Sequence, residues 1–428
     1  MPINPVITHS ESRRARFQLI NLALIIILSP LFVFPRPQII WILFLGIGLI
    51  LGTRWLLEKR FFPVTPFDAA LAILVFWVGF GLRHCSDLCV GLSKLTGIVL
   101  AIYFFYTLCD ALSSPERLGL ALGIFILIGL SVAIIGTISR TDGSSIPEID
   151  LSNKLKEVPR MIMRLDRAEK GINPNPLAGT LLLFVPLGIT SVNSFVKRAG
   201  QKRNVKTALL CLSIAVIVAA EFAAIVFSRS FGALGALGIV FLLIGKMRRL
   251  LKIGMGIIVV FLLIILIKTP SISQSEIVAD LKTNINKSAL DRLPFWRGGM
   301  AAANENPILG IGMDNFRLRF PFKYEDAHAH NQYIHTAAEI GIPGLIAYLA
   351  ILISAAWMTI EVGRSRAPDW MIQSMRGLAW GQAGFAIFGL ADAIPLGAKP
   401  GVFFWMSLAI MTSIYLWVKR QEEGEKRA

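Results

Sequence analysis

Long apolar runs recur along almost the whole chain, and this feature constrains the fold more than any other. About twelve predominantly apolar stretches are separated by polar segments. A run of about 17–25 apolar residues is long enough to cross the hydrocarbon core of a bilayer as a helix. Backbone polar groups must be satisfied within the protein in lipid, which favours helices as spanning elements. The sequence therefore predicts an all-α, polytopic helical bundle in a membrane.

The apolar runs predict about twelve transmembrane helices with two larger loops that contain short helices. The expected spans lie near residues 17–35, 38–52, 66–83, 91–112, 117–138, 174–195, 207–227, 231–245, 253–268, 335–360, 372–390 and 401–418. This divides the chain into five parts: spans one to five in 1–138, a loop over 139–173, spans six to nine in 174–268, a large loop over 269–334, and three spans with a tail in 335–428.

Composition excludes a soluble protein. Of the 428 residues, 55% are hydrophobic and only 16% are charged, whereas soluble domains carry about 25% charged residues. The formal net charge of +16 would suit a nucleic-acid partner. The basic residues, however, form short clusters between apolar runs rather than a face of a soluble domain. We therefore expect membrane lipid around the chain and no nucleic acid, and the sequence leaves the oligomeric state open.

The basic clusters also predict the orientation, because short cytoplasmic loops carry an excess of Lys and Arg. With twelve spans and a cytoplasmic N-terminus, the Lys- and Arg-rich segments all fall on one side, including the C-terminal tail. The loops at 139–173 and 269–334 then lie on the opposite side. Residues Ser152 to Lys170 of the first loop have apolar residues at helical spacing, which predicts an amphipathic helix on the membrane surface.

Unusual polar residues gather at the end of the second long loop. The segment from Asp326 to His335 holds three of the five histidines, His328, His330 and His335, and Asn331 follows His330 directly. A helix start with water-facing histidines, capped by Asn331 or Asp326, is one interpretation. A functional histidine at the membrane surface is another. The Asp-x-His-x-His pattern also offers metal ligands, although no second ligand cluster appears in the sequence and we expect no metal.

Three further charged residues stand out, two of them close to predicted membrane boundaries and one in the second long loop. Arg229 lies between Ser228 and Ser230 in a hairpin, where it is a functional candidate or snorkels to the headgroups. Asp392 lies between the last two spans, as a functional candidate, a helix cap or a partner of Lys399. Arg292 stands four residues before Trp296, so the two would stack on one face of a helix, and on its own the segment is typical of an ordinary amphipathic loop helix. Glycines at 341 and 344 permit close backbone approach to the helix that follows the histidines.

Several of these segments resemble the bacterial O-antigen ligases and their polymerase relatives. His330-Asn331, separated by nine residues from Gly341-x-x-Gly344, is similar to the signature of that superfamily. Four other segments look like family elements: Arg292-x-x-x-Trp296, Asn306-Pro307-Ile-Leu-Gly310-Ile-Gly312, Ser228-Arg229-Ser230 and Asn173-Pro174-Asn175-Pro176. The resemblance covers residues 170–345 by motif and the whole chain by topology.

The resemblance implies an inverting, metal-independent glycosyl transfer on the periplasmic side of the bacterial inner membrane, without a cofactor. The donor would be a glycan on undecaprenyl diphosphate and the acceptor a sugar hydroxyl of the lipid A core, as in lipopolysaccharide assembly. Four residues match family positions: His330 as general base, Arg229 and Arg292 as binders of the diphosphate, and Asp392, which matches mainly by topological position. Substrate binding is expected from Asn331, Arg297, His328, Arg164 and Arg160.

Two other functions compete with the ligase. An O-antigen polymerase shares the chemistry and adds repeat units to a growing chain. A twelve-helix secondary transporter belongs to a different class, but transporters usually carry polar or broken segments at the bilayer midplane in corresponding halves. Here the polar residues cluster at one predicted face. An O-antigen ligase is the function that the sequence favours.

Overall fold

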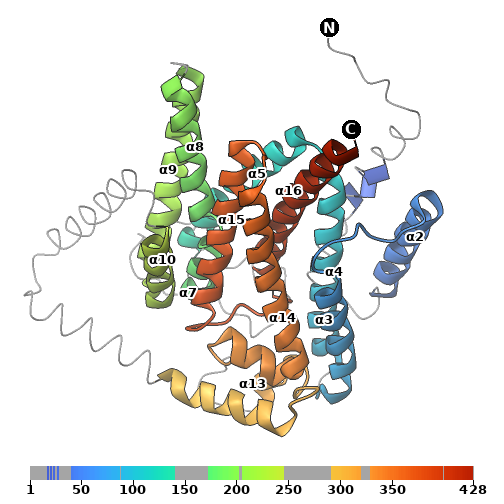
Figure 1. Ribbon diagram of the computed structural model, residues 1–428. Helices are drawn as coiled ribbons and strands as arrows, with labels where there is room; N and C mark the ends of the chain where they lie inside the picture. The colour runs from blue at the N-terminus through green and yellow to red at the C-terminus, as the bar shows by residue number, and fades with distance from the viewer. Residues whose placement is uncertain are drawn as a thin grey trace, which may run out of the picture.

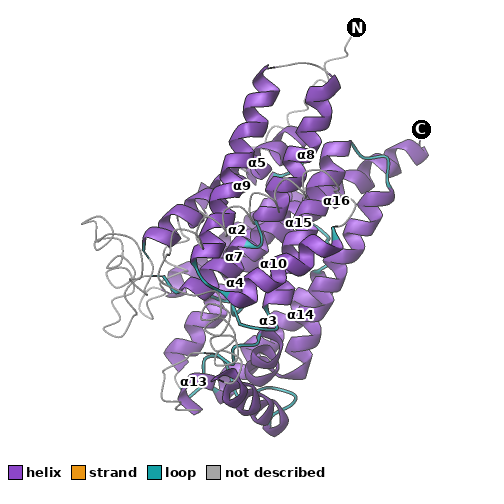
Figure 2. Cartoon of the chain, turned by 90° about the vertical axis from the view of Figure 1, so that its left-hand side faces the viewer, coloured by secondary structure: helices purple, strands orange, loops and turns teal. Residues whose placement is uncertain are grey.

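The computed structural model describes residues 40–86, 88–139, 172–201, 205–244, 291–319, 328–398 and 400–427, with isolated positions between 17 and 27. The regular elements of these ranges are helices (Figures 1 and 2). The expected span at 253–268 and most of the one at 17–35 lie outside the described residues. So do most of both long loops, including Arg160 and Arg164.

The helices follow the apolar runs closely, with ends that differ by a few residues. Six of them are long and apolar enough to cross a membrane within the described ranges. This confirms an all-helical membrane protein, while the count of about twelve spans stays a prediction. The helices are α2 (Ile40–Glu58), α3 (Asp68–Gly81), η1 (Leu82–His84), α4 (Leu88–Ala111), α5 (Pro115–Ile138), α7 (Pro174–Leu181), α8 (Val185–Gln201), α9 (Val205–Phe227), α10 (Phe231–Leu243), α13 (Phe316–Arg319), α14 (Gln332–Arg364), α15 (Asp369–Phe388) and α16 (Gly401–Arg427), with a further helix over residues 291–305.

The C-terminal helices α14, α15 and α16 pack against one another and hold the rest of the bundle together. α14 also packs on α3, α15 on α8 and α10, and α16 on α4 and α5 (Figure 1). Their facing sides are apolar and fully buried, with Tyr348 on α14, Phe388 on α15 and Trp405 on α16. In contrast, α9 exposes a stripe of large apolar residues that includes Leu209, Leu212 and Val216. Such a stripe suits contact with lipid chains.

The sixth expected span, near 174–195, is confirmed as a candidate membrane span over Pro174–Ser194, and a break divides it into α7 and α8. α7 ends at Leu181 and α8 starts at Val185, with a tight turn between them in which Phe184 N donates to Leu181 O at 3.1 Å. Pro186 accounts for the break, because proline has no N–H and its ring clashes with the carbonyl four residues earlier. Gly381 of α15 lets the turn approach closely, since a Cβ there would lie 2.7 Å from Leu183 O.

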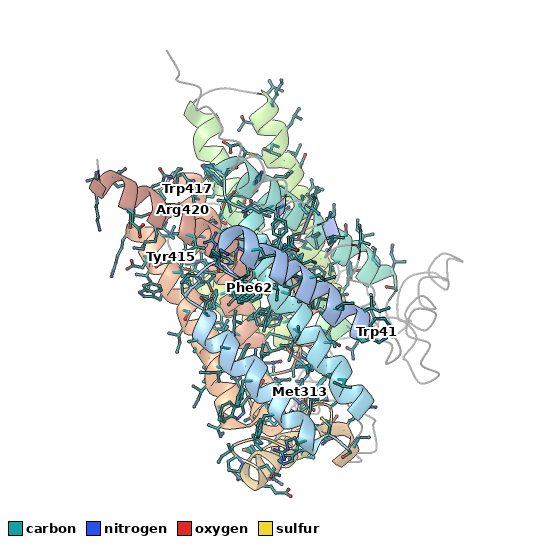
Figure 3. The ribbon with its side chains drawn as sticks, turned by 90° about the vertical axis from the view of Figure 1, so that its right-hand side faces the viewer. Trp41, Phe62, Met313, Tyr415, Trp417 and Arg420 are labelled. Atoms are coloured by element: carbon teal, nitrogen blue, oxygen red, sulfur yellow. The ribbon has the colours of Figure 1, made fainter. Side chains whose placement is uncertain are left out.

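The helix at 291–305, the loop that follows it and the start of α14 lie together at one end of the bundle, which we call the loop end (lower end of Figure 1). Figure 3 labels Met313 at the loop end and Tyr415, Trp417 and Arg420 of α16 at the opposite end. The loop end holds both the predicted histidine segment and the connection between α15 and α16, so distant parts of the sequence meet there.

Candidate active site

His330 and Asp392 form the central contact at the loop end. His330 Nδ1 lies 3.0 Å from Asp392 Oδ1, although 62 residues separate the two in sequence. The side chain of Asp392 is only 3% exposed, whereas that of His330 is 17% exposed. A carboxylate can only accept, so the hydrogen-bonded Nδ1 carries the proton and the lone pair of the neutral ring lies on Nε2. The pair therefore has the geometry of an oriented general base.

Asp392 stays ionised at neutral pH. Burial alone raises the pKa of its carboxyl, but the hydrogen bond from His330 and the nearby His328 and His330 rings outweigh it and lower the pKa below the usual value. The backbone N–H of Ala393 donates to the same oxygen at 2.9 Å. A buried carboxylate with two donors can hold the imidazole ring in one orientation and stabilise its positive charge after protonation.

The backbone of His330 is strained and held from a distant helix. Its φ is +47°, in the left-handed region that residues with a side chain seldom adopt. Trp296 Nε1 donates to the His330 carbonyl at 3.1 Å, and the Phe295 ring meets the imidazole edge-on at 5.1 Å between centroids. Strain of this kind costs about 1–3 kcal/mol and persists where surrounding contacts impose it. The helix at 291–305 therefore helps to fix the base in place.

Asn331 is the N-cap of α14, as one of the sequence interpretations proposed. Its Oδ1 accepts from the backbone N–H groups of Tyr333 and Ile334, both at 3.0 Å. Its Nδ2 donates to Leu390 O at 3.0 Å. The cap thus connects the start of α14 to the segment that carries Asp392, so Asn331 supports the His330–Asp392 geometry.

His328 joins the same cluster. Its Nδ1 accepts from the backbone N–H of His330 at 3.3 Å and lies 3.7 Å from Asp392 Oδ1. The His328 and His330 ring centroids are 4.6 Å apart. One ligand-type atom of each of His328, His330 and Asp392 lies within 4.8 Å of the other two. The carboxylate of this cluster comes from the α15–α16 connection, and Asp326, which the sequence pattern offered, lies outside the described residues.

The helix at 291–305 carries Arg292 and contacts His330 through Phe295 and Trp296. It packs closely on the start of α14, since a Cβ on Gly299 would lie 2.5 Å from the Ile334 side chain. Arg292 is half-buried and stands three and four residues before Phe295 and Trp296, on the face that holds His330. Arg297 is exposed and lies about 200° around the helix from Phe295. The structure therefore turns Arg297 away from this cluster.

Arg229 lies at the tip of the α9–α10 hairpin, on the same end of the bundle as Asp392. It is exposed and has a φ of +54°. Ser228 Oγ accepts from Ser230 N at 3.2 Å, which shapes the tip. Gly232, three residues on, packs against the neighbour of Asp392, since a Cβ there would lie 3.0 Å from the Ala391 side chain. Arg229 and His330 thus both carry a strained backbone at the loop end.

The two motif glycines serve different purposes. Gly341 has a φ of +79° and kinks α14, and a Cβ there would collide with Ile308 O. Ile342 N, just after the kink, donates to Pro307 O at 2.7 Å, and Ile311 N donates to Ala338 O at 2.8 Å. The close backbone approach expected at Gly341 is therefore made by the loop at 307–312. At Gly344 the nearest atoms belong to the Ile340 side chain of the same helix.

A second buried polar group lies one turn into α14. His335 Nε2 is 3.4 Å from Glu339 Oε2, and both side chains are at most 5% exposed. Phe316 N donates to Glu339 Oε1 at 3.4 Å, while Asp314 nearby pairs with Lys94 at 3.3 Å. These contacts connect the loop at 312–316 to α14 and α4. They suit a structural role in holding the loop end together.

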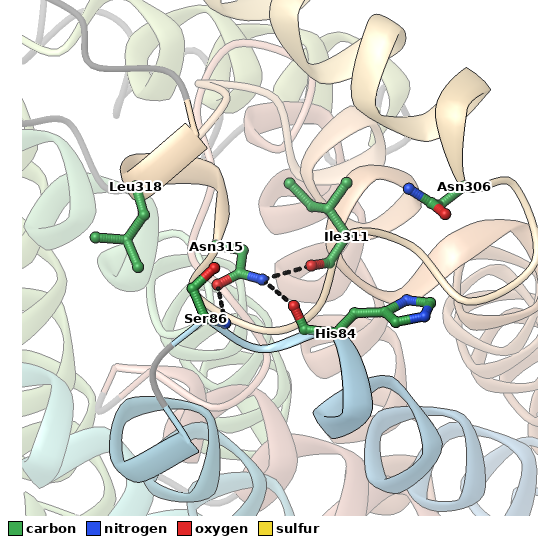
Figure 4. Close-up of a pocket in the computed structure, with 6 residues that line it drawn as sticks. All are labelled: His84, Ser86, Asn306, Ile311, Asn315 and Leu318. Carbon is green, nitrogen blue, oxygen red and sulfur yellow. Dashed lines mark hydrogen bonds between the residues drawn. The ribbon is translucent and has the colours of Figure 1, made fainter.

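A cavity of about 420 Å³ lies beside the loop at 306–318 (Figure 4). Asn315 shapes it, because its Nδ2 donates to His84 O and Ile311 O, and its Oδ1 accepts from Ser86 N at 3.0 Å. None of His328, His330 and Asp392 lines this cavity. It is lined by His84, Ser86, Asn306, Ile311, Asn315 and Leu318. Its size falls in the range of small-molecule sites.

Sequence reasoning missed three parts of this arrangement. It predicted that Trp296 stacks with Arg292 and did not foresee the contact of Trp296 with the His330 carbonyl, and it overlooked Phe295 and the His335–Glu339 pair. The four-residue spacing of His335 and Glu339 on a predicted helix was a usable signal for the pair. No local signal pointed to the Trp296 contact, because its partner lies 34 residues away.

Comparison with protein families identifies part of the chain. Residues 207–349 match the family model described as O-Antigen ligase. The matched range includes Arg229, the helix at 291–305, His330 and the kink at Gly341. A search of curated proteins found no match to the chain. The match therefore confirms, over residues 207–349, the resemblance of this helical membrane protein to the O-antigen ligase superfamily.

Proposed function

We propose that the protein is an O-antigen ligase of the bacterial inner membrane, with cytoplasmic termini and a periplasmic active site at the loop end. It transfers a glycan from undecaprenyl diphosphate to a sugar hydroxyl of the lipid A core. The observation that carries this proposal is the contact of 3.0 Å between His330 Nδ1 and Asp392 Oδ1. The backbone of His330 is strained and is held by the hydrogen bond from Trp296. The match of residues 207–349 to the ligase family supports it.

His330 supplies the base for this reaction. A sugar hydroxyl is a poor nucleophile at neutral pH and needs a group to take its proton. With Nδ1–H donated to Asp392, the lone pair of the neutral ring on His330 Nε2 accepts that proton as the hydroxyl oxygen attacks the anomeric carbon. Asp392 then stabilises the imidazolium that forms. Proton transfer to a positioned base is typically worth about 100- to 10,000-fold in rate.

The arginines act on the leaving group. As the hydroxyl attacks from the opposite face of the sugar, the bond between the anomeric carbon and the diphosphate oxygen breaks, and the diphosphate gains one negative charge. Guanidinium groups offer bidentate, permanently charged donors to phosphate oxygens. Two arginines are our candidates for this role. Arg292 is half-buried on the helix whose Phe295 and Trp296 contact His330. Arg229 lies on the hairpin that packs near Asp392. Their charge makes a divalent ion unnecessary in this mechanism.

Asn331 and His328 position the base rather than the substrate in this scheme, because they bond to the backbone around His330 and Asp392. Arg160, Arg164 and Arg297 stay proposals for glycan contacts farther from the reacting bond. Both substrates are amphiphiles, so the site is expected to open sideways to the outer leaflet of the inner membrane.

The decisive experiment is transfer in vitro from a lipid-linked glycan to purified lipid A core, with the His330→Ala variant as the control. We expect the wild-type protein to form glycosylated core and the variant to lose transfer while keeping its helical content. If product appears as longer lipid-linked glycan with no glycosylated core, the protein is the related polymerase. In cells, loss of a ligase leaves polymerised chains on the carrier lipid, whereas loss of a polymerase leaves single repeat units.

A further inference from the structure

We propose that His328, His330 and Asp392 form a binding site for a divalent transition-metal ion, best matched by Zn²⁺, and that the bound ion switches the His330 base off. The binding site stands on geometry alone. The switch rests on the proposed function of His330, and the experiment below separates the two.

The three side chains converge well enough to share one ion. Asp392 Oδ1 lies 3.0 Å from His330 Nδ1 and 3.7 Å from His328 Nδ1. All three ligand-type atoms lie within 4.8 Å of one another. Two ligands that each bind Zn²⁺ at about 2.1 Å can be at most about 4.2 Å apart, so a small closing movement completes the site. Two imidazoles and one carboxylate, with an open fourth position, are a ligand set that Zn²⁺ takes in proteins.

The lone pair of His328 Nδ1 is engaged by the backbone N–H of His330, and an ion at this site would take it over and break that hydrogen bond of 3.3 Å. Because His328 Nδ1 accepts this N–H, that nitrogen carries no proton. The His328 and His330 side chains are 19% and 17% exposed, while Asp392 is 3% exposed. An ion can therefore approach from the side of the histidines and meet the buried carboxylate behind them. Mg²⁺ prefers an all-oxygen octahedral shell, so this set favours zinc-like ions over Mg²⁺.

Metal binding would change the tautomer of His330. In the ion-free protein, Nδ1–H donates to Asp392 and the lone pair of Nε2 is available as a base. An ion on Nδ1 needs the lone pair of that nitrogen. The Nδ1–H bond therefore breaks, an Nε2–H bond forms through water, and the ring stays neutral. Nε2 then carries a hydrogen and cannot accept the proton of the acceptor hydroxyl, so transfer stops without any change at the arginines.

The binding part is tested with protein purified without a polyhistidine tag. Co²⁺ is titrated as a visible probe of the Zn²⁺ site, and Zn²⁺ or Mg²⁺ is then added as competitor. We expect saturable Co²⁺ absorption that Zn²⁺ abolishes and Mg²⁺ leaves unchanged. His328→Asn should weaken Co²⁺ binding by at least about tenfold, because loss of even an outer-shell partner costs 10- to 100-fold. The matched variant His84→Asn, in the separate cavity, should bind as the wild type does.

Equal Co²⁺ binding by wild type and His328→Asn, or no saturable binding by wild type, would overturn the site.

The switch is tested in the transfer reaction with the same protein. Zn²⁺ at saturating concentration should inhibit transfer, and a chelator should restore it. Zn²⁺ that binds but leaves transfer unchanged, or increases it, would overturn the switch and leave the site standing. Normal transfer by His330→Ala would instead refute the proposed base, whatever the Co²⁺ titration shows.

Discussion

His330 Nδ1 and Asp392 Oδ1 are 3.0 Å apart, and each residue is held by a different part of the chain. The His330 carbonyl accepts from Trp296 of the helix at 291–305. Asp392 lies four residues after the end of α15. In the segment between them, Gly389 O accepts from the backbone N–H of Gln332 and Leu390 O accepts from the Asn331 side-chain amide. The contact therefore depends on how three segments pack together: the helix at 291–305, the start of α14 and the segment after α15. A change that displaces any one of them should affect the proposed base.

Replacing Asp392 by Asn should reduce transfer strongly without unfolding the protein. The amide can bond to Nδ1 as donor or acceptor, so the ring is no longer restricted to one tautomer, and the imidazolium loses its negative partner. We expect kcat to fall by about 100-fold or more, since that is the usual contribution of a positioned base. Initial rates of transfer with the purified variant measure this.

Asp369→Asn is the matched control for Asp392→Asn. It makes the same change at the exposed start of α15, at the other end of the helix. We expect kcat of Asp369→Asn to equal that of the wild type. A similar loss in both variants would mean that the Asp392 effect comes from general destabilisation and not from the His330 contact.

Arg292→Lys and Arg229→Lys should each lower kcat by about 10- to 100-fold. Lysine keeps the charge but replaces a planar bidentate donor by a point charge, so part of the stabilisation of the departing diphosphate is lost. The acceptor KM should change little, because the acceptor does not contact the diphosphate site in this scheme. Arg366→Lys, in the exposed α14–α15 connection, is the control. Wild-type rates for both site variants would remove the arginines from the mechanism.

Excess chelator should leave transfer intact or raise it. The proposed mechanism uses arginine charge where other glycosyltransferases use a divalent ion, so removing metals takes away nothing that the reaction needs. An increase in the rate of transfer would be consistent with release of an inhibitory ion from the His328–His330–Asp392 site. The measurement is transfer after dialysis against EDTA, with Mg²⁺ re-addition as the control. Activity that disappears with EDTA and returns with Mg²⁺ would contradict a metal-independent reaction.

Much of the fold could be predicted from the sequence because lipid imposes a simple length rule. The apolar runs at 117–138 and 207–227 became α5 (Pro115–Ile138) and α9 (Val205–Phe227) almost to the residue. The break before α8 could have been foreseen from Pro186, whose effect on a helix is local. The kink at Gly341 could not, since it depends on the approach of Pro307 and Ile308 from the preceding loop.

Some residues of the candidate site could also be predicted from the sequence, whereas their contacts depend on the fold. His330, Asn331 and Arg292 stand in short motifs, so the sequence alone singled them out. Asp392 was identified mainly by its topological position, and its contact with His330 depends on how α15 docks against the start of α14. The contact of Trp296 with the His330 carbonyl could not be predicted, because an i, i+4 neighbour is visible in the sequence and a carbonyl 34 residues away is not.

Gly341→Ala should destabilise the protein by about 1–3 kcal/mol. The added Cβ meets Ile308 O, and a φ of +79° is itself unfavourable for alanine. Thermal unfolding in detergent measures the loss. Gly363→Ala on the same helix is the matched control, because a Cβ there meets nothing within 4 Å of it, so its midpoint should be unchanged or raised. Equal midpoints for both variants would show that the kink does not need glycine.

Trp296→Phe should lower kcat by about two- to tenfold with little change in thermal stability. Phenylalanine keeps most of the ring packing but cannot donate to the His330 carbonyl, and one hydrogen bond is worth about 0.5–1.5 kcal/mol. Without that donor, the strained backbone of His330 can relax from its φ of +47° and move the imidazole away from Asp392. Trp357→Phe, on the exposed side of α14, is the control.

If Trp296→Phe and Asp392→Asn are combined, the loss of kcat should be smaller than the product of the single losses, because both changes act on the same imidazole. Fully multiplicative losses would show that Trp296 acts independently of the His330–Asp392 pair.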